Sequence, residues 1–533
     1  MHRKPAIARH PAPGLATALG RFQSVNALID HWALTQPDRM ALIGPRGRQG
    51  WSRLSWSALR QESMRLATGL QARGIRTGDH VGILADGEAY VDCLVGYLAL
   101  LRAGAVMVPL NPRFVDEELR YAIGFSDCIA VLAQSQLTPR VRALAAGLPV
   151  LRQVLDLEDC VADADAGTPD AGSPERKDGL PELGTDDLAN IVFTSGTTAR
   201  PKAVMHTHGS ALATGAIFSA ALGLRNDDVF HHAIPFFTSS GTQFAPMPAF
   251  WVGATLVLEP RFDAAAMLQR IEDEGSTAVI GVPSHYLFML DVLERTPRSL
   301  SSMRLWDYGG AAMPASAVRV LAAKYPKVEL RKQYGMTETG PSGTVLTPDQ
   351  ALRRIDSAGR PMPLCEVAIL DDQGQPVTGQ TPGEIAIRSP ACMRGYYKNE
   401  DATRQVLQDG WVRTGDVGWL DEEGYLYYSD RIKDIINRGG LKISSVEIEE
   451  VLYQHPGVLE AAVVAMPHEK LGEDILAFVV PKDAARLDLD ELRAFCGEHL
   501  ADYKVPRRID CLQEFPKNSM GKIQKAVLRD RIR

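Results

Sequence analysis

A loop rich in glycine and hydroxyl residues is the segment best suited to phosphate chemistry. It reads Thr194-Ser195-Gly196-Thr197-Thr198-Ala199-Arg200-Pro201-Lys202 and follows a short apolar run, Ile191 to Phe193. Glycine lets the backbone approach an anion, hydroxyls donate hydrogen bonds to phosphate oxygens, and the lysine adds positive charge. The loop is not a Walker A loop, because Pro201 precedes the lysine where that motif has glycine. The pattern predicts a phosphate-binding loop, with an exposed polar loop as the alternative.

A second segment combines groups suited to nucleotide and metal binding. Tyr334-Gly335-Met336-Thr337-Glu338-Thr339 follows the strand-like run Val328 to Leu330. An aromatic face can stack on a base, and Mg²⁺ is usually bound through one or two carboxylates together with substrate phosphates. Upstream, Tyr308-Gly309-Gly310-Ala311-Ala312 would let the backbone lie against a planar ligand. For both segments, a tight turn is the alternative.

Three segments further along the chain add a carboxylate and cations. Trp411 to Asp416 ends in a carboxylate that can accept hydrogen bonds from two ribose hydroxyls. Asp430-Arg431-Ile432-Lys433-Asp434 supplies a planar guanidinium, which binds ribose or phosphate well. Pro516-Lys517-Asn518-Ser519-Met520-Gly521-Lys522 places one lysine after a glycine. Taken singly, each segment is more typical of a solvated charged surface.

The elements that must position these residues indicate an α/β protein. Strand-like and helix-like patterns alternate twice, which predicts βαβ units and parallel sheets. The two alternations are His80 to Leu84, Tyr90 to Ala103 and Val106 to Pro109, and then Ala254 to Leu258, Ala264 to Glu274 and Thr277 to Val282. Between them, Asp163 to Asp187 is predicted to be an exposed connector, because it is rich in Asp, Gly, Pro and Ala.

Two smaller units are predicted after these sheets. From Glu366 to Ile387, short strands separated by turn residues predict a small antiparallel or barrel-like unit. A final α+β unit of about 100 residues is expected to begin near Asp430. In it, Ser444 to Glu447 reads as a capping box ahead of an apolar-periodic helix. Strands at Ala461 to Ala465 and Ala477 to Val480 and a helix at Glu491 to His499 complete the unit.

Composition narrows the class of protein. The chain has 533 residues, 45% apolar and 23% charged, so two or more ordinary globular domains are expected. A net charge of −7 gives no general reason to bind nucleic acid. The seven cysteines are scattered without a CxxC pair, which predicts neither disulfides nor zinc and favours the reducing cytoplasm.

The longest apolar run, near Cys93 to Leu101, is too short to span a bilayer and predicts a buried helix. Residues 1–21 lack the apolar region of a secretory signal.

Taken together and in this order, the segments resemble those of the adenylate-forming superfamily, which includes acyl-CoA synthetases, adenylation domains and luciferases. The resemblance spans Phe22 to Lys525, and the segments Arg438 to Ile443 and Leu500 to Pro506 are most similar to acyl-CoA synthetases. It implies an α/β fold with a large N-terminal domain, residues 1–431, that contains βα-layered sheets and a small barrel-like subdomain. It also implies a small α+β C-terminal lid, residues 432–533, that rotates between two half-reactions.

The resemblance implies a role for each segment. Lys522 would be the adenylation lysine, Lys433 the hinge, Thr337 an α-phosphate contact and Glu338 the Mg²⁺ ligand. The residues implied in nucleotide or CoA binding are Thr194, Ser195, Gly196, Thr197, Thr198, Lys202, Gly309, Gly310, Ala311, Tyr334, Asp416, Arg431, Gly439 and Gly440. Phe236, Thr238, Gly335 and Met336 would line the acid pocket. The implied small molecules are ATP, Mg²⁺, CoA and a carboxylic acid.

Three positions depart from the family pattern. Ala199 and Ala203 replace frequent glycines of the phosphate loop, which restricts φ there. Thr238 stands where many acyl-CoA synthetases have a histidine, so histidine-based gating is not expected. Ser445 replaces a frequent proline at the start of the lid helix, and a capped helix tolerates this.

The predicted function is an AMP-forming acid:CoA ligase, acting on a fatty or aryl-alkanoic acid because the pocket segments are largely apolar. The main competing function is a stand-alone adenylating enzyme that loads the phosphopantetheine of a separate carrier protein. A luciferase-type oxidation and a nucleotide-binding regulator without catalysis are two further candidates. The acid itself, the acceptor and the oligomeric state, a homodimer among the options, are left open by the sequence.

Overall fold

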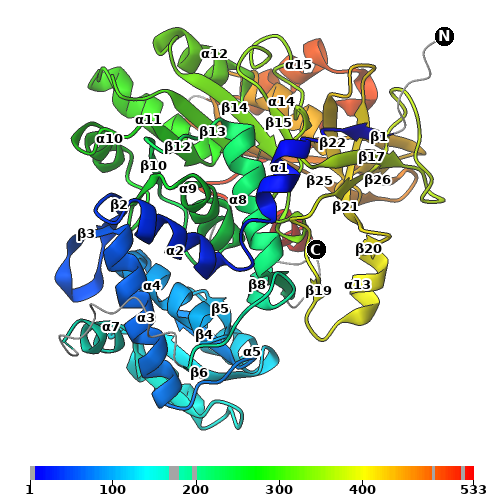
Figure 1. Ribbon diagram of the computed structural model, residues 1–533. Helices are drawn as coiled ribbons and strands as arrows, with labels where there is room; N and C mark the ends of the chain where they lie inside the picture. The colour runs from blue at the N-terminus through cyan, green and yellow to red at the C-terminus, as the bar shows by residue number, and fades with distance from the viewer. Residues whose placement is uncertain are drawn as a thin grey trace.

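The computed structural model describes residues 7–166, 179–194, 201–311, 313–482, 487–517 and 523–532 (Figure 1). Within these ranges, the first sheet is ordered β19 (Gly395–Tyr396), β9 (Lys202–Thr207), β8 (Leu188–Thr194), β5 (Val106–Leu110), β4 (His80–Leu84), β6 (Cys128–Ala133) and β7 (Gln153–Asp156). From β8 to β7 all neighbouring strands are parallel, as the βαβ pattern predicts. The loop predicted to bind phosphate joins β8 to β9, and its residues 195–200 lie outside the described ranges.

The second sheet carries the middle of the chain. Its order is β16 (Arg360–Pro361), β15 (Thr344–Leu346), β14 (Glu329–Tyr334), β13 (Leu305–Gly309), β12 (Ala278–Gly281), β10 (Val229–His232), β11 (Thr255–Leu258), β2 (Met40–Pro45) and β3 (Trp51–Ser55). The strands from β14 to β2 are parallel, and the two ends of the sheet are antiparallel. Because β13 and β14 are parallel neighbours, their last residues, Gly309 and Tyr334, lie at the same edge of the sheet. This carboxyl edge is where α/β proteins bind ligands.

The helices of this part of the chain cover the two sheets. They are α1 (Pro13–Leu19), α2 (Val25–Thr35), α3 (Trp56–Ala72), α4 (Tyr90–Arg102), α5 (Asp116–Phe125), α6 (Thr138–Ala145), α7 (Leu157–Ala166), α8 (His208–Leu222), α9 (Pro246–Val252), α10 (Ala264–Asp273), α11 (Pro283–Arg295) and α12 (Ala315–Lys324). Every residue of α4 is buried, which confirms the core helix predicted from its apolar run. The helix α7 corrects the connector prediction, because the chain stays helical to residue 166 before the connector can begin.

One large core joins the two sheets. It contains apolar residues of β4 and α4 together with residues of β10, β11 and β12. Helix α8 lies between the cyan strands of the first sheet and the green strands of the second (Figure 1), and all but two of its residues are buried. Its burial on all sides explains why no polar face is visible in its sequence.

A third sheet is antiparallel, as predicted for Glu366 to Ile387. Its main path is β1 (Ile7–Arg9), β17 (Glu366–Leu370), β18 (Gly383–Arg388), β21 (Trp411–Leu420) and β20 (Leu407–Gln408), and β22 (Leu426–Arg431) pairs with β21. Helix α13 (Glu400–Val406) precedes β20. In the antiparallel register of β21 and β22, Asp416 lies opposite Arg431. The sheet therefore brings together two residues that the sequence places in separate segments.

The last part of the chain forms a fourth sheet with three helices. The order is β24 (Leu441–Ile443), β23 (Ile436–Arg438), β26 (Gly472–Pro481) and β25 (Val458–His468), with β27 (Arg508–Cys511) on β26, and the helices are α14 (Ser445–Gln454), α15 (Leu489–His499) and α16 (Lys525–Asp530). The predicted α14 is present, but only half of its capping box forms. Ser444 accepts from the Glu447 N–H, whereas the Glu447 carboxylate accepts from Lys504 at 2.6 and 2.8 Å.

Candidate active site

A buried carboxylate stands at the carboxyl edge of the second sheet. Glu338 lies on a short 3₁₀ turn, Thr337–Thr339, that follows β14 directly, and it is only 6% exposed. The Tyr396 hydroxyl donates to Glu338 Oε1 at 2.8 Å, and Lys202 Nζ lies 4.7 Å from the centre of the Tyr396 ring. Burial raises the pKa of the Glu338 carboxyl, while the Tyr396 hydrogen bond and the charges of Lys202 and Arg431 act in the opposite direction. A cation bound here would relieve the cost of that buried charge.

The carboxylate also fits the chemistry of a magnesium site. Mg²⁺ needs only one or two protein carboxylates, since substrate phosphates and water supply its other oxygens. In the described part of the chain, no group of three or more His, Cys, Asp or Glu side chains forms a complete metal cage. A single buried carboxylate, bonded to Tyr396, therefore fits the donor set of a metal that arrives with a nucleotide.

Thr337 is held by two residues from distant segments. Its hydroxyl lies 2.8 Å from that of Ser239, and its carbonyl oxygen lies 3.0 Å from Nε2 of His206. Burial lowers the pKa of His206 to about 4, so at neutral pH the uncharged ring donates to this carbonyl. Tyr396, Ser239 and His206 are not among the residues predicted from sequence, because no local pattern links them to Glu338 and Thr337.

The glycines around this turn are required by close backbone packing. A Cβ on Gly335 would lie 1.7 Å from the carbonyl oxygen of Pro341, and Gly340 has φ +62°. A Cβ on Gly309 would lie 2.7 Å from the carbonyl oxygen of Gln333 on the neighbouring strand. The predicted adenine-pocket glycine Gly309 thus also lets β13 and β14 pack together.

The predicted ribose carboxylate belongs to a second buried cluster. Asp416, 6% exposed, accepts from the Tyr334 hydroxyl at 2.7 Å through Oδ2. Its other oxygen, Oδ1, lies 3.4 Å from Nε of Arg431. Three predicted site residues, from β14, β21 and β22, therefore meet in space. A bound ribose would share the Asp416 carboxylate with the Tyr334 hydroxyl and the Arg431 guanidinium, which already point toward that carboxylate.

The residues predicted for the acid pocket lie on two segments, Phe236 and Thr238 after β10 and Gly335 and Met336 after β14. The Thr238 hydroxyl donates to the Pro235 carbonyl at 2.8 Å and accepts from the Gly241 N–H at 3.0 Å. Thr238 therefore accepts from an N–H within the π-helical turn Ser240–Phe244. Phe236 is 4% exposed and packs edge-on against Tyr90 with ring centres 5.8 Å apart. Met336 and Gly335, at the end of β14, are partly buried.

The remaining predicted site residues lie outside the clusters around Glu338 and Asp416. Lys433 is exposed, and its carbonyl accepts from Arg529 at 3.5 Å. Gly439 and Gly440 form the tight link between β23 and β24, with φ of +60° and +92°. Gly310 and Ala311 follow β13, and Thr194 ends β8. Lys522, Ser195, Gly196, Thr197 and Thr198 lie outside the described residues.

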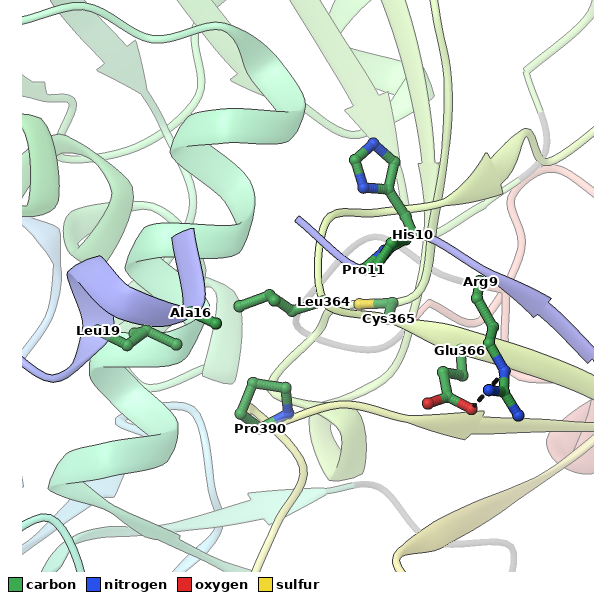
Figure 2. A pocket seen from close by; sticks show the side chains of 9 residues that line it. All are labelled: Arg9, His10, Pro11, Ala16, Leu19, Leu364, Cys365, Glu366 and Pro390. Carbon is green, nitrogen blue, oxygen red and sulfur yellow. Dashed lines mark ion pairs between the residues drawn. The ribbon is translucent and has the colours of Figure 1, made fainter. Parts of the chain in front are cut away.

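One cavity lies away from these residues. It has a volume of about 450 Å³, and Arg9, His10, Leu19, Leu364 and Pro390 are among its lining residues (Figure 2). Arg9 is paired with Glu366 at 3.3 Å, across the edge where β1 joins β17. The cavity contains none of the predicted site residues. It is a gap between the N-terminal segment and the third sheet.

Comparison with known proteins gives the family. Residues 29–397 match the AMP-binding enzyme family, and residues 447–522 match the AMP-binding enzyme C-terminal domain. The feruloyl-CoA synthase of an Amycolatopsis species is 36% identical over 93% of this chain and 98% of its own length. The long-chain-fatty-acid–CoA ligase FadD13 of Mycobacterium tuberculosis is 33% identical over 90% of this chain and 93% of its own.

A solved relative is similar in structure as well. ATP-bound MatB from Rhodopseudomonas palustris aligns with a TM-score of 0.85 and 29% identity, over 95% of this chain and 99% of that one. The apo form of MatB aligns with a TM-score of 0.76, also at 29% identity, over 96% and 99%. The chain belongs to the AMP-binding enzyme family. Within it, the protein is an acid–thiol ligase of the AMP-forming, acyl-CoA synthetase class. No described helix is long and apolar enough to cross a bilayer.

Proposed function

We propose that this ligase uses the Glu338 and Asp416 clusters to bind ATP and activate a fatty or aryl-alkanoic acid for transfer to CoA. The observation that carries the proposal is the convergence of Lys202, Thr337 and Glu338 around the Tyr396 side chain and the end of β14. These groups come from strands of two different sheets, yet they meet at one carboxyl edge.

The first half-reaction turns the acid into a good electrophile. A carboxylate oxygen of the acid attacks the α-phosphorus of ATP, a new O–P bond forms, and the bond to pyrophosphate breaks. Lys202 offsets negative charge on the β- and γ-phosphates, and Thr337 donates to the α-phosphate. Mg²⁺ bound to Glu338 would neutralise charge on the phosphates. Asp416 and Arg431 hold the ribose, and the cation of Lys522 would offset developing negative charge.

The second half-reaction releases AMP. The CoA sulfur attacks the acyl carbon, the bond to the AMP oxygen breaks, and the thiol proton is lost. We assign this step to a lid, residues 432–533, that rotates about Lys433 and brings Gly439 and Gly440 to the thiol arm. The division is supported by sheet membership, because β22 ends at Arg431 in the third sheet and β23 begins the fourth sheet at Ile436.

The acid class rests on the pocket and the relatives. Phe236 and the core around it are apolar, and the similar enzymes are named for ferulic and long-chain fatty acids. Because those names specify CoA, CoA is the proposed acceptor, with a carrier-protein phosphopantetheine as the second candidate. All seven cysteines are free, which supports the proposed cytoplasmic location.

A substrate panel tests the proposal. The protein is incubated with ATP, Mg²⁺ and CoA and with acetate, fatty acids of increasing length, cinnamic and phenylalkanoic acids and several amino acids. AMP and thioesters are measured by mass spectrometry. We expect thioester from the fatty or aryl acids. A preference for acetate or a charged amino acid would overturn the acid class, and acyl-AMP without thioester would favour the carrier-protein acceptor.

A further inference from the structure

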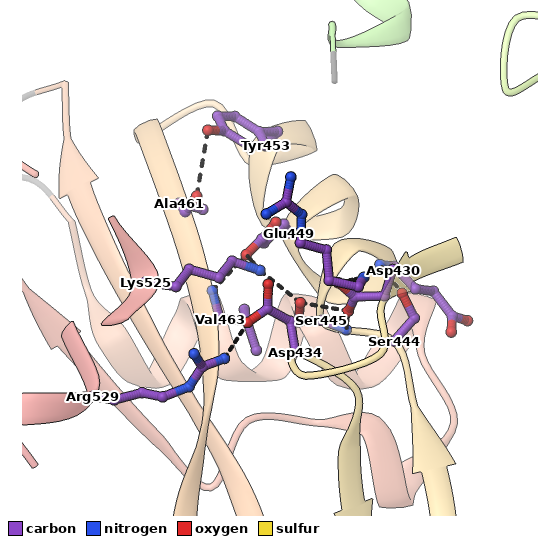
Figure 3. A network of polar contacts seen from close by, with 12 residues as sticks. Asp430, Asp434, Ser444, Ser445, Glu449, Tyr453, Ala461, Val463, Lys525 and Arg529 are labelled. Carbon is purple, nitrogen blue, oxygen red and sulfur yellow. Dashed lines mark hydrogen bonds and ion pairs between the residues drawn. The ribbon is translucent and has the colours of Figure 1, made fainter. Parts of the chain in front are cut away.

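The serine that replaces a frequent family proline makes a contact that proline cannot make. Ser445 is the first residue of α14 and is fully buried. Its N–H and its hydroxyl both donate to Oδ2 of Asp430, each at 2.6 Å (Figure 3). Asp430 is 1% exposed, so its carboxylate depends on these donors at Oδ2 and on the Arg431 N–H, which donates to Oδ1 at 2.7 Å.

This contact crosses the proposed hinge. Asp430 lies on β22, in the third sheet, whereas Ser445 lies on α14, beside the fourth sheet. The neighbouring Ser444 hydroxyl also crosses, donating to the Ser429 carbonyl at 2.7 Å. A rotation about Lys433 would move one side of each bond relative to the other and break it.

The same serine is bound to the end of the chain. Lys525 Nζ donates to the Ser445 hydroxyl oxygen at 2.6 Å and pairs with Glu449 at 2.7 Å (Figure 3). Lys525 is three residues after Lys522, so the two Cα atoms are at most about 11 Å apart. An anchor at Lys525 therefore restricts where the adenylation lysine can reach.

We propose that Asp430, Ser445 and Lys525 form a latch that holds the lid in the adenylation orientation and positions Lys522 for the first half-reaction. The proposal rests on the proposed function and hinge. It makes Ser445 a positioning residue, since Ser445 acts through Lys525 and Asp430. The whole chain aligns with ATP-bound MatB at a TM-score of 0.85 and with apo MatB at 0.76.

Ser445→Pro is the sharpest test. Proline is favoured at the first position of a helix, and Ser444, with φ −75° and ψ 126°, has the extended backbone that proline requires before it. The substitution removes both donors to Asp430 and the acceptor of Lys525 while the helix start is preserved. We expect ATP–pyrophosphate exchange lowered about tenfold in kcat/KM for ATP, because hydrogen bonds to a buried carboxylate are lost.

Measuring the two half-reactions separately distinguishes a positioning role of Ser445 from general damage to the enzyme. Thioester formation from supplied acyl-AMP should be unchanged or faster in Ser445→Pro, because the latch no longer opposes rotation. Lys504→Gln, which breaks the ion pair to Glu447 on the same helix, is the matched control and should leave both rates unchanged. Equal losses in both half-reactions, or exchange at the native rate, would overturn the latch. If the melting temperature falls, Ser445→Ala replaces the proline variant. It is judged by the same comparison, the rate of ATP–pyrophosphate exchange against the rate of thioester formation.

A distance measurement tests the latch independently of activity. Cys511, exposed on β27, is spin-labelled together with a cysteine introduced at exposed Glu294. With ATP bound, the native protein should give one dominant distance by electron paramagnetic resonance, and Ser445→Pro should add a second. Identical distributions would contradict the latch. If no acid is activated by the native protein, the proposed function fails while this measurement still decides the latch.

Discussion

The proposed ATP-binding edge and the proposed lid hold their charged groups in different ways. Glu338 and Asp416 are each fixed by a tyrosine hydroxyl and by strands of the large sheets. In the described part of the proposed lid, Ser444 and Ser445, close to the proposed hinge, make polar contacts to the rest of the molecule. The first arrangement suits groups that must be in place before ATP binds. The second suits a part that has to be held and then released.

The largest effect is expected from Glu338→Gln, which tests whether the fixed edge is catalytic. Loss of the negative charge should lower acyl-AMP formation by about 10²–10³-fold, comparable to removing one group that stabilises a transition-state charge. The measurement is ATP–pyrophosphate exchange with saturating acid. Glu366→Gln, in the surface pair with Arg388, is the control. Native exchange in Glu338→Gln would remove Glu338 from the mechanism.

Lys433→Pro tests whether the lid must be released. Proline fixes φ near −65°, so rotation about this residue should be blocked and thioester formation from supplied acyl-AMP should fall by at least about tenfold. Lys433→Ala, which leaves φ free, should retain this step. An intact second half-reaction in the proline variant would show that the hinge lies elsewhere.

A smaller effect is expected from Tyr396→Phe, which weakens the support of Glu338 without removing it. The lost hydrogen bond should raise the pKa of Glu338 further and lower adenylation about tenfold, more strongly at acidic pH. The ring that Lys202 contacts is preserved. Tyr397→Phe, whose hydroxyl donates to Asp127 at 2.7 Å, is the neighbouring control. Equal effects of the two substitutions would contradict a specific role for Tyr396.

The last effect concerns stability below neutral pH and not activity. Burial lowers the pKa of His206 to about 4, whereas an unfolded histidine has a pKa of about 6.5. Below pH 6.5 the unfolded state therefore binds more protons than the folded state, and stability falls as the pH falls. His206→Gln should reduce the loss between pH 6.5 and 5 by about 2 kcal/mol, measured by urea denaturation. An unchanged pH dependence would mean that His206 is protonated in the folded protein.

Much of the fold could be predicted because its signals are local. The apolar run of α4, the alternation around β4 and β5, and the turn residues near Glu366 each specify an element without reference to distant residues. Helix α7 is not evident from sequence, because its acidic, alanine-rich end has the same composition as the segment predicted to be a connector. The sequence predicts a capping box for Glu447 from its spacing to Ser444, while its actual partner, Lys504, is 57 residues away.

By itself, the sequence determined the family, the order of the motifs and the residue types available for ATP chemistry, because each motif is continuous along the chain. Only the tertiary structure decided which groups support them. Tyr396 reaches Glu338 across 58 residues and Ser239 reaches Thr337 across 98. Such pairs depend on strand order and register, which place segments from different sheets at one edge. For the same reason, the sequence shows only that Ser445 replaces a proline frequent in the family. The fold alone places Asp430 and Lys525 against it.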